Sequence, residues 1–162
     1  MKRILLITSA ILILTSCNNQ NESNSGLQNV SSNQEQSVHE MKSMISLFEI
    51  PATDITRAVN FYQAILDINI EKMELPGMEM GIFPYEEQIV TGVIMKGEDY
   101  TPSSNGPTIY LNCGDNLQTI LDKVEINGGK VIVPKTAHAD GSGFFALFID
   151  SEGNKLGLNS PN

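Results

Sequence analysis

Hydrophobic and polar positions divide this chain into three stretches with different patterns. Residues 4–14 are almost continuously apolar, residues 18–40 carry Asn, Gln or Ser at 15 of 23 positions, and alternation of apolar and polar positions begins at Met44. Such runs are typical of a targeting segment, a disordered segment and a folded domain, respectively. The segments that we expect are residues 1–16, 17–43 and 44–160.

The first half of the patterned run predicts strands around a single helix. Residues 45–50 read as a strand that Pro51 ends, and Asp54 is well placed to cap a helix. Apolar residues over positions 55–66 then recur at helical spacing. Strand-like runs follow at residues 68–73, 78–83 and 89–95.

The same order of elements recurs after a polar connection over residues 97–107. Residues 108–112 predict a strand, Asp115 is a second candidate helix cap, and apolar residues over 117–124 lie on one helical face. Further strands are expected at residues 130–133, 144–149 and 155–158. Aligning Asp54 with Asp115 places strand on strand and helix on helix, which predicts an α+β domain of two tandem βαβββ units. An α+β domain without internal duplication is the alternative.

The residues before Cys17 follow the order of a secretory signal. Lys2 and Arg3 precede an apolar run that is shorter than the roughly 20 residues needed to span a bilayer. The sequence Leu-Thr-Ser-Cys over 14–17 resembles the lipobox of bacterial lipoproteins. A cysteine is nucleophilic enough to take a diacylglyceryl group, and two or three acyl chains hold a protein on a membrane. We expect cleavage before Cys17, a lipid on Cys17 and anchoring in the bacterial cell envelope; an ordinary secreted protein is the alternative.

The stretch after Cys17 predicts a flexible tether, because it lacks apolar residues to offset the entropy of ordering. As a coil it would reach about 25 Å. After cleavage the chain carries 8 basic and 19 acidic residues, a net charge of −11. This charge argues against binding nucleic acid or anionic lipid through a basic patch. Cys113 is left without a disulfide partner, so we expect a small buried residue there.

Three segments of the patterned run resemble the vicinal oxygen chelate family, which includes glyoxalases and bleomycin-resistance proteins. They are residues 48–54 with the helix that follows them, residues 110–112 with the next helix and Gly128-Gly129-Lys130, and the hairpin Phe-Ile-Asp-Ser-Glu-Gly-Asn over 148–154. The resemblance covers about residues 44–160 and implies two βαβββ units around a cleft. It also implies a small-molecule ligand or substrate and the possibility of a homodimer. It specifies function poorly, because one fold hosts several chemistries.

The resemblance also implies where a metal would bind, and this chain departs from the family there. Metal-dependent members place His, Gln or Glu ligands at the positions of Leu47 and Thr108, and a Glu at the position of Gly157. The remaining ligand belongs to the strand expected near 89–96, which contains no His, Asp or Glu. Leucine and glycine side chains cannot coordinate a metal, and one threonine is a weak donor. We therefore predict no metal and no cofactor.

Alternation along the strands, combined with the resemblance, identifies the residues that face the cleft. Positions 47 and 108 face it in metal-binding relatives, so Glu49, Tyr110, Asn112 and Lys155 are the candidate ligand-binding residues. The apolar residues between them are expected to pack on the helices. Glu49 is an acid in a largely apolar strand, and burying a carboxylate is unfavourable unless it is paired. Its role is a ligand-binding or catalytic acid, a structural pair with Lys155 or Tyr110, or an exposed residue at a wide cleft mouth.

Two further sets of side chains have alternative roles. His138, in a loop with Asp140, is either a general acid or base at the cleft mouth or a solvated loop residue, and we favour the solvated residue. Met73, Met78 and Met80 either line an adaptable apolar pocket or fill space in the sheet.

Three functions are compatible with these residues. The first is a metal-free module that binds a small organic molecule at the cell envelope. The second is a glyoxalase-like lyase or transferase that uses Glu49, with Tyr110, in place of the metal. The third is an envelope interaction protein whose cleft is unused. The mass of a small molecule that co-purifies with the domain distinguishes them.

Overall fold

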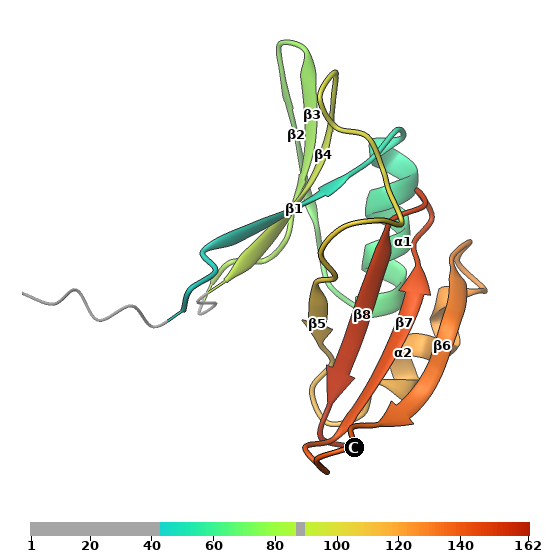
Figure 1. Ribbon diagram of the computed structural model, residues 1–162. Coiled ribbons are helices and arrows are strands. Elements are labelled where there is room, and N and C mark those ends of the chain that lie inside the picture. The colour runs from blue at the N-terminus through green and yellow to red at the C-terminus, as the bar shows by residue number, and fades with distance from the viewer. Residues whose placement is uncertain (1–42, 87–89) are drawn as a thin grey trace, which may run out of the picture. The chain divides into compact units, whose positions relative to one another are not determined.

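The computed structural model describes residues 43–86 and 90–162 (Figure 1). Cys17, the expected signal segment 1–16 and the expected tether as far as residue 42 lie outside these ranges, as does Ile89. Within the described ranges, no helix is long and apolar enough to cross a membrane.

The first half contains one helix and a four-stranded sheet. Its elements are β1 (Leu47–Pro51), α1 (Ile55–Leu66), β2 (Glu71–Leu75), β3 (Met78–Ile82) and β4 (Thr91–Gly97). The strand order is β1-β4-β3-β2, with β1 parallel to β4 and the other neighbours antiparallel. Gly77 closes the β2–β3 hairpin with φ of 80°, a conformation that favours glycine.

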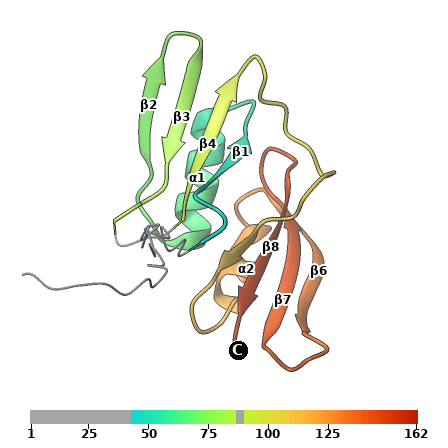
Figure 2. The ribbon, with the colours of Figure 1, turned by 60° about the vertical axis from the view of Figure 1, so that its left-hand side comes forward.

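The second half repeats this arrangement (Figure 2). Its elements are β5 (Tyr110–Asn112), α2 (Gln118–Val124), β6 (Lys130–Ala137), β7 (Phe144–Ile149) and β8 (Lys155–Ser160). The strand order is β5-β8-β7-β6, and again only the first pair is parallel. The predicted α+β fold of two βαβββ units is confirmed.

Helix α1 begins where the sequence places it. The Asp54 carboxylate accepts a hydrogen bond from the backbone N–H of Arg57 at 3.0 Å, as an N-cap does. The face towards the sheet is fully enclosed, with Phe61 2% exposed and Tyr62 and Ile65 0%. The burial of these large side chains is the main contribution of α1 to the stability of the core.

Asp115 is not the cap of the second helix. Helix α2 begins at Gln118, and the side-chain carbonyl of Asn116 accepts the Gln118 N–H at 3.0 Å. Leu117 is fully buried, and its N–H donates to the Ser160 hydroxyl at 3.0 Å. Packing of Leu117 thus sets where the helix starts. The duplication holds for the order of elements but not for the alignment of Asp115 with the first cap.

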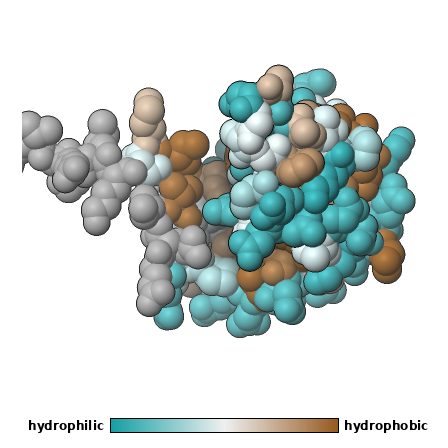
Figure 3. Space-filling view, turned by 90° about the horizontal axis from the view of Figure 1, so that it is seen from below, coloured by the Kyte–Doolittle hydropathy of each residue, from teal (hydrophilic) through white to brown (hydrophobic). Residues whose placement is uncertain are grey.

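Strands β1 and β5 begin later than expected. The ladder between β1 and β4 starts at Leu47, so Met44 and Ile45 precede it and are 96% and 57% exposed. Figure 3 shows an apolar patch beside the start of the described chain. The expected strand over 108–112 is shortened to Tyr110–Asn112. Strand β2 starts at Glu71 and β6 extends to Ala137, while β3, β4 and β8 differ from the expected bounds by one or two residues at an end.

The predicted faces of the strands agree with the burial. Ile50, Leu111 and Leu158 point towards the helices and are at most 8% exposed, whereas Leu47 and Tyr110 are 47% exposed on the opposite face. Helix α1 packs on β3 and β4, α2 packs on β6, and the two helices contact each other. The core therefore lies on the helix side of both sheets.

Glu152, in the turn between β7 and β8, attaches the second half to the start of α1. Its side chain is fully enclosed and accepts hydrogen bonds from the Thr53 N–H at 2.8 Å, the Asp54 N–H at 3.1 Å and Arg57 Nε at 2.7 Å. Burial favours a raised pKa, but the hydrogen bonds from Arg57 and the two N–H groups outweigh it and lower the pKa of Glu152. This carboxylate is therefore held in its charged form.

The neighbouring Asp150 and Asn154 make a second set of contacts between the halves. The buried Asp150 accepts the Tyr62 hydroxyl at 2.7 Å, and burial raises the pKa of Tyr62 well above its usual value. The Asn154 amide donates to the Pro51 carbonyl at 2.8 Å and accepts the Ser103 N–H at 3.0 Å. The hairpin over 148–154, which carries part of the family resemblance, therefore holds the two halves of the domain together.

Candidate functional site

A pocket of about 150 Å³ lies where the two halves meet, and we call it the junction pocket. It is bounded by the end of β1, the start of β8 and the connection between β4 and β5. Its lining residues are Glu49, Ile50, Pro51, Thr101, Ser103, Asn105, Pro107, Ile109, Asn154, Lys155 and Leu156. The family resemblance implies a ligand site between the halves, and two of the four predicted site residues line this pocket.

Glu49 is exposed in the junction pocket, and its partner is a residue that the sequence did not indicate. The Tyr100 hydroxyl lies 3.3 Å from both carboxylate oxygens of Glu49. Desolvation and the negative charge of Glu49 raise the pKa of Tyr100, so the phenol remains a hydrogen-bond donor. Of the three alternatives for Glu49, the structural pair with Lys155 or Tyr110 is not found among the described residues, because the connection after β4 brings Tyr100 to the carboxylate instead.

Lys155, the first residue of β8, lines the same pocket with a partly buried side chain. Its backbone N–H donates to the Ser103 carbonyl at 3.4 Å, which positions the start of the strand. Among residues 43–86 and 90–162, neither Glu49 nor Lys155 has an ion-pair partner within 4.0 Å. The pocket therefore presents an acidic and a basic group that are not neutralised by each other.

Tyr110 and Asn112 lie outside the lining of the junction pocket. The Tyr110 ring covers Gly157 so closely that a Cβ atom there would be 2.2 Å from ring carbon Cδ1. The exposed Asn112 uses its side-chain carbonyl to accept the Gly114 N–H at 3.0 Å, a local turn contact. Of the four predicted site residues, the structure brings together Glu49 and Lys155. Ligand binding by the other two stays a prediction.

The residues at the positions implied for a metal do not fit a divalent ion. Leu47 offers no donor atom, Thr108 precedes β5 with one hydroxyl, and the space above Gly157 is filled by the Tyr110 ring. In the described part of the chain, no group of three or more His, Cys, Asp or Glu side chains is placed to hold a metal. A site of the family's type would require both new donors and movement of Tyr110.

His138 lies in the β6–β7 loop, where its side chain is partly exposed and also packs on its neighbours. Its ring lies 5.1 Å from the Phe145 ring, centroid to centroid, and Nε2 lies 2.8 Å from the side-chain oxygen of Asn159. The His138 N–H also donates to the Gly143 carbonyl at 2.9 Å. The residue is partly buried and lines neither pocket described here.

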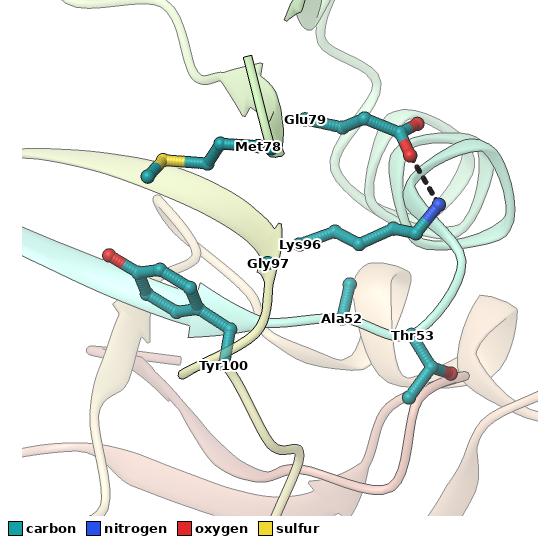
Figure 4. A pocket seen from close by; sticks show the side chains of 8 residues that line it. Ala52, Thr53, Met78, Glu79, Lys96, Gly97 and Tyr100 are labelled. Atoms are coloured by element: carbon teal, nitrogen blue, oxygen red, sulfur yellow. Dashed lines mark hydrogen bonds and ion pairs between the residues drawn. The ribbon is translucent and has the colours of Figure 1, made fainter. Parts of the chain in front are cut away.

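A second pocket, of about 300 Å³, lies at the strand ends of the first half, and we call it the strand-end pocket (Figure 4). Lys96 on β4 forms an ion pair with Glu79 on β3, while Met78 and Tyr100 point away from that pair. The hydrogen bond to Glu79 raises the pKa of Lys96. A protonated, paired lysine is not a nucleophile, so we assign no covalent chemistry to it.

The two pockets are adjacent at β1. Pro51 lines the junction pocket, and Ala52, the next residue, lines the strand-end pocket. Tyr100 lines the strand-end pocket while its hydroxyl reaches Glu49 in the other. The Tyr100–Glu49 contact thus stands between them. The sequence contained no signal for it, because the connection that carries Tyr100 has no periodic pattern.

Comparisons with family models match nearly the whole described domain. The model described as the Glyoxalase/Bleomycin resistance protein/Dioxygenase superfamily matches residues 44–158. A second model, the prokaryotic membrane lipoprotein lipid attachment site, matches residues 1–18. A glyoxylase-like domain-containing protein from Didymella fabae is 33% identical over 120 residues, which cover 68% of this chain and 88% of that protein.

Solved structures share the fold at low sequence identity. A glyoxalase/bleomycin resistance protein from Albidiferax ferrireducens has a TM-score of 0.59 at 20% identity, covering 73% of this chain and 98% of that one. An antibiotic-binding protein from a Streptomyces species has a TM-score of 0.58 at 21% identity, covering 74% and 97%. A mutant of glyoxalase I from Zea mays has a TM-score of 0.58 at 17% identity, covering 71% of this chain and 46% of the maize chain. This chain thus spans about half the length of the maize enzyme.

Proposed function

This chain belongs to the Glyoxalase/Bleomycin resistance protein/Dioxygenase superfamily, and from that premise we propose that it is a small-molecule binding protein that works without the divalent metal of metal-dependent relatives. In this proposal the ligand lies in the junction pocket, and a lipid on Cys17 holds the protein at a membrane of the bacterial envelope.

The observation that carries the proposal is the placement of Glu49 and Lys155 in one pocket between the halves. Because the two charges do not pair with each other, both are available to a ligand that offers a hydrogen-bond donor and an acceptor. Ligand pockets usually combine apolar walls with a few such polar groups, and here Ile50, Ile109 and Leu156 supply the apolar walls.

The size of the pocket limits what it encloses. Pockets for drug-sized ligands hold about 300–1,000 Å³, whereas the junction pocket holds about 150 Å³. It therefore takes a small molecule, or one polar end of a larger molecule whose remainder lies over the exposed strand faces. Tyr110, which is half exposed on β5, and the neighbouring Asn112 are our proposed contacts for such a remainder.

The proposal includes no divalent metal, because the residues at the family's ligand positions lack suitable donor atoms. Leu47 and Gly157 carry no ligating atom, and Tyr110 blocks the space above Gly157. Glu49 would be the acid in the enzymatic alternative, a lyase or transferase without metal. That alternative uses the same pocket, so turnover of the bound molecule separates it from plain binding.

Membrane attachment is supported by the lipid attachment site that matches residues 1–18 and by the lipobox order before Cys17. A coil of the expected tether's length would let the domain move about 25 Å from the membrane surface. We also propose that the protein forms a homodimer, which the mass of the detergent-extracted protein in solution tests.

Native mass spectrometry of the full-length protein extracted from membranes tests this function. We expect a mass increment from one co-purified small molecule on the wild type, and loss of that increment from the double variant Glu49→Gln, Lys155→Met. Glu125→Gln is the matched control, since Glu125 is exposed at the end of α2. A double variant that keeps the increment, or a wild type that carries none, would contradict the proposal.

A further inference from the structure

Three methionines lie in register across three neighbouring strands of the first sheet. Met73 on β2 is the register partner of Met80 on β3, and Met80 is the register partner of Met95 on β4. Figure 1 shows these strands side by side. With Met78, they place four of the chain's seven methionines on β2–β4. We call Met73, Met80 and Met95 the methionine row.

All three side chains of the row point to the same face of the sheet. Gly81 and Ile94, the residues next to Met80 and Met95, point the other way, towards the core: a Cβ on Gly81 would meet Val59 of α1. Successive residues in a strand alternate between faces, so the row faces away from the helix. Its exposure is graded, from Met73 at 41% through partly buried Met80 to Met95 at 5%.

Cross-strand geometry brings the three sulfur atoms within reach of one point. Directly opposed residues on one face have Cβ atoms about 4.5–5.5 Å apart, so the outer two Cβ atoms lie about 10 Å apart. The methionine side chain is unbranched and has three rotatable bonds. The thioethers of Met73 and Met95 can therefore turn inward over Met80 without any movement of the backbone.

The neighbours of the row are mostly apolar, and two carboxylates, Glu71 and Glu49, stand at its edges: Glu71 precedes Met73 by two residues and is the register partner of Ile82. Ile82 and Val93 lie on one side of the row on the same face, and Leu75 and Met78 lie on the other. Glu49 is the register partner of Val93, which makes it a diagonal neighbour of Met95. Diagonal neighbours on one face are about 7–8 Å apart. A cation over the row would thus have apolar neighbours on both sides and carboxylates nearby.

We propose that the methionine row is a binding site for one Cu(I) ion, held by three thioether sulfurs. Thioethers are soft neutral donors, which suit Cu(I) and give no advantage to Zn²⁺, Mg²⁺ or Mn²⁺. They need no deprotonation, so the site differs in kind from the His and Glu sites that the family resemblance implies. Simple filling of space does not require sulfur, because leucine has a similar volume and suits a strand face equally well. This site lies outside the junction pocket and does not depend on the proposed function.

Titration calorimetry with Cu(I), supplied anaerobically as its acetonitrile complex, tests the site. The protein is the full-length chain in detergent with Cys113→Ala, which removes the competing thiol in the described domain. We expect one Cu(I) per chain and no comparable heat with Zn²⁺. Met80→Leu should weaken binding by at least about tenfold, since even the loss of an outer-shell contact costs 10–100-fold in metal affinity. Met44→Leu is the control, because Met44 is 96% exposed and outside the row.

A second measurement, on the protein with the methionine row intact, tests the site even if Met80→Leu folds poorly. With isotope-labelled methionine methyl groups, addition of Ag(I), a stable cation of the same charge and softness, should shift the signals of Met73, Met80 and Met95 most in the unmutated row. Equal shifts at Met44, no binding by the starting protein, or a folded Met80→Leu variant with unchanged affinity would each overturn the proposal.

Discussion

The ring of Tyr110 packs closely on Gly157, its register partner on the neighbouring parallel strand. A Cβ atom on Gly157 would come within 2.2 Å of Tyr110 Cδ1 and 2.4 Å of Cε1. The position at which metal-dependent relatives carry a glutamate is therefore not simply empty of a ligand but covered by an aromatic side chain. This pair makes the departure from the family's metal site a matter of packing as well as of donor type.

We predict that Gly157→Ala destabilises the domain through its contact with Tyr110. Overpacking typically costs about 1–3 kcal/mol, and because Tyr110 is half exposed its ring can swing partly aside. Urea unfolding of the variant measures the loss. Adding Tyr110→Ala to Gly157→Ala should recover part of it. If the two substitutions are merely additive, the Tyr110–Gly157 contact is not the cause.

Glu152→Gln should lower stability, because it removes the charge that accepts five hydrogen bonds from Thr53, Asp54 and Arg57. Hydrogen bonds to charged groups contribute about 1.5–3 kcal/mol, and the amide NH₂ of Gln would also face the donors of Thr53 and Arg57. Chemical unfolding compared with Glu125→Gln measures this. A loss equal to that of the exposed control would show that the Glu152 contacts are not stabilising.

The same carboxylate predicts a pH dependence of stability. The pKa of Glu152 is lowered in the folded state from its ordinary value of 4.5. Its contribution is thus fully present above pH 4.5 and is lost as the pH falls through the folded pKa. The gap in melting temperature between wild type and Glu152→Gln should therefore narrow below pH 4.5. A gap that stays constant down to pH 2 would contradict the assigned role.

Much of the fold could be predicted from the sequence, because the spacing of apolar residues reflects which face of each helix or strand is buried. Asp54 and the apolar face of α1 were read correctly, since capping and helical spacing are local properties. The start of α2 was misplaced, because Leu117 is fixed by tertiary burial and by the Ser160 hydroxyl, which lies far along the chain. Local signals cannot report that contact.

The candidate site is only partly predictable for the same reason. Strand alternation, combined with the family resemblance, identified Glu49 and Lys155 as facing the cleft, and both line the junction pocket. Tyr100 was missed, because it belongs to a connection whose path depends on contacts such as that of Ser103 with Asn154. The sequence identified the hairpin that contains Glu152. It did not predict that the Glu152 carboxylate binds the start of α1.

Cys17 is predicted to be the mature N-terminus and to carry lipid. The order of charged, apolar and small residues before it, together with the match to the lipid attachment site, motivates this expectation. Labelling of the wild type and of Cys17→Ala with a radioactive fatty acid checks it. We expect label only in the wild type; equal labelling, or membrane-bound protein without label, would refute lipidation at this residue.

The purified protein should contain no stoichiometric zinc, nickel, manganese or iron. Leucine, threonine and glycine at the expected ligand positions are the reason. Elemental analysis after purification without a chelator measures the content of each metal. A metal-to-protein ratio near one for any of the four that falls when Glu49 or Thr108 is substituted would mean that another donor set has taken over.

The proposed ligand site in the junction pocket is tested most directly by the affinity of Glu49→Gln for the co-purified molecule, determined by calorimetry on the full-length protein. Loss of one charged hydrogen bond, about 1.5–3 kcal/mol, corresponds to a weakening of about 10-fold to 150-fold. Because Glu49 is exposed and Gln preserves its shape, Glu49→Gln should change the melting temperature no more than the Glu125→Gln control does. Weaker binding with normal stability is the predicted result. Unchanged affinity in the folded variant would contradict a ligand site at Glu49.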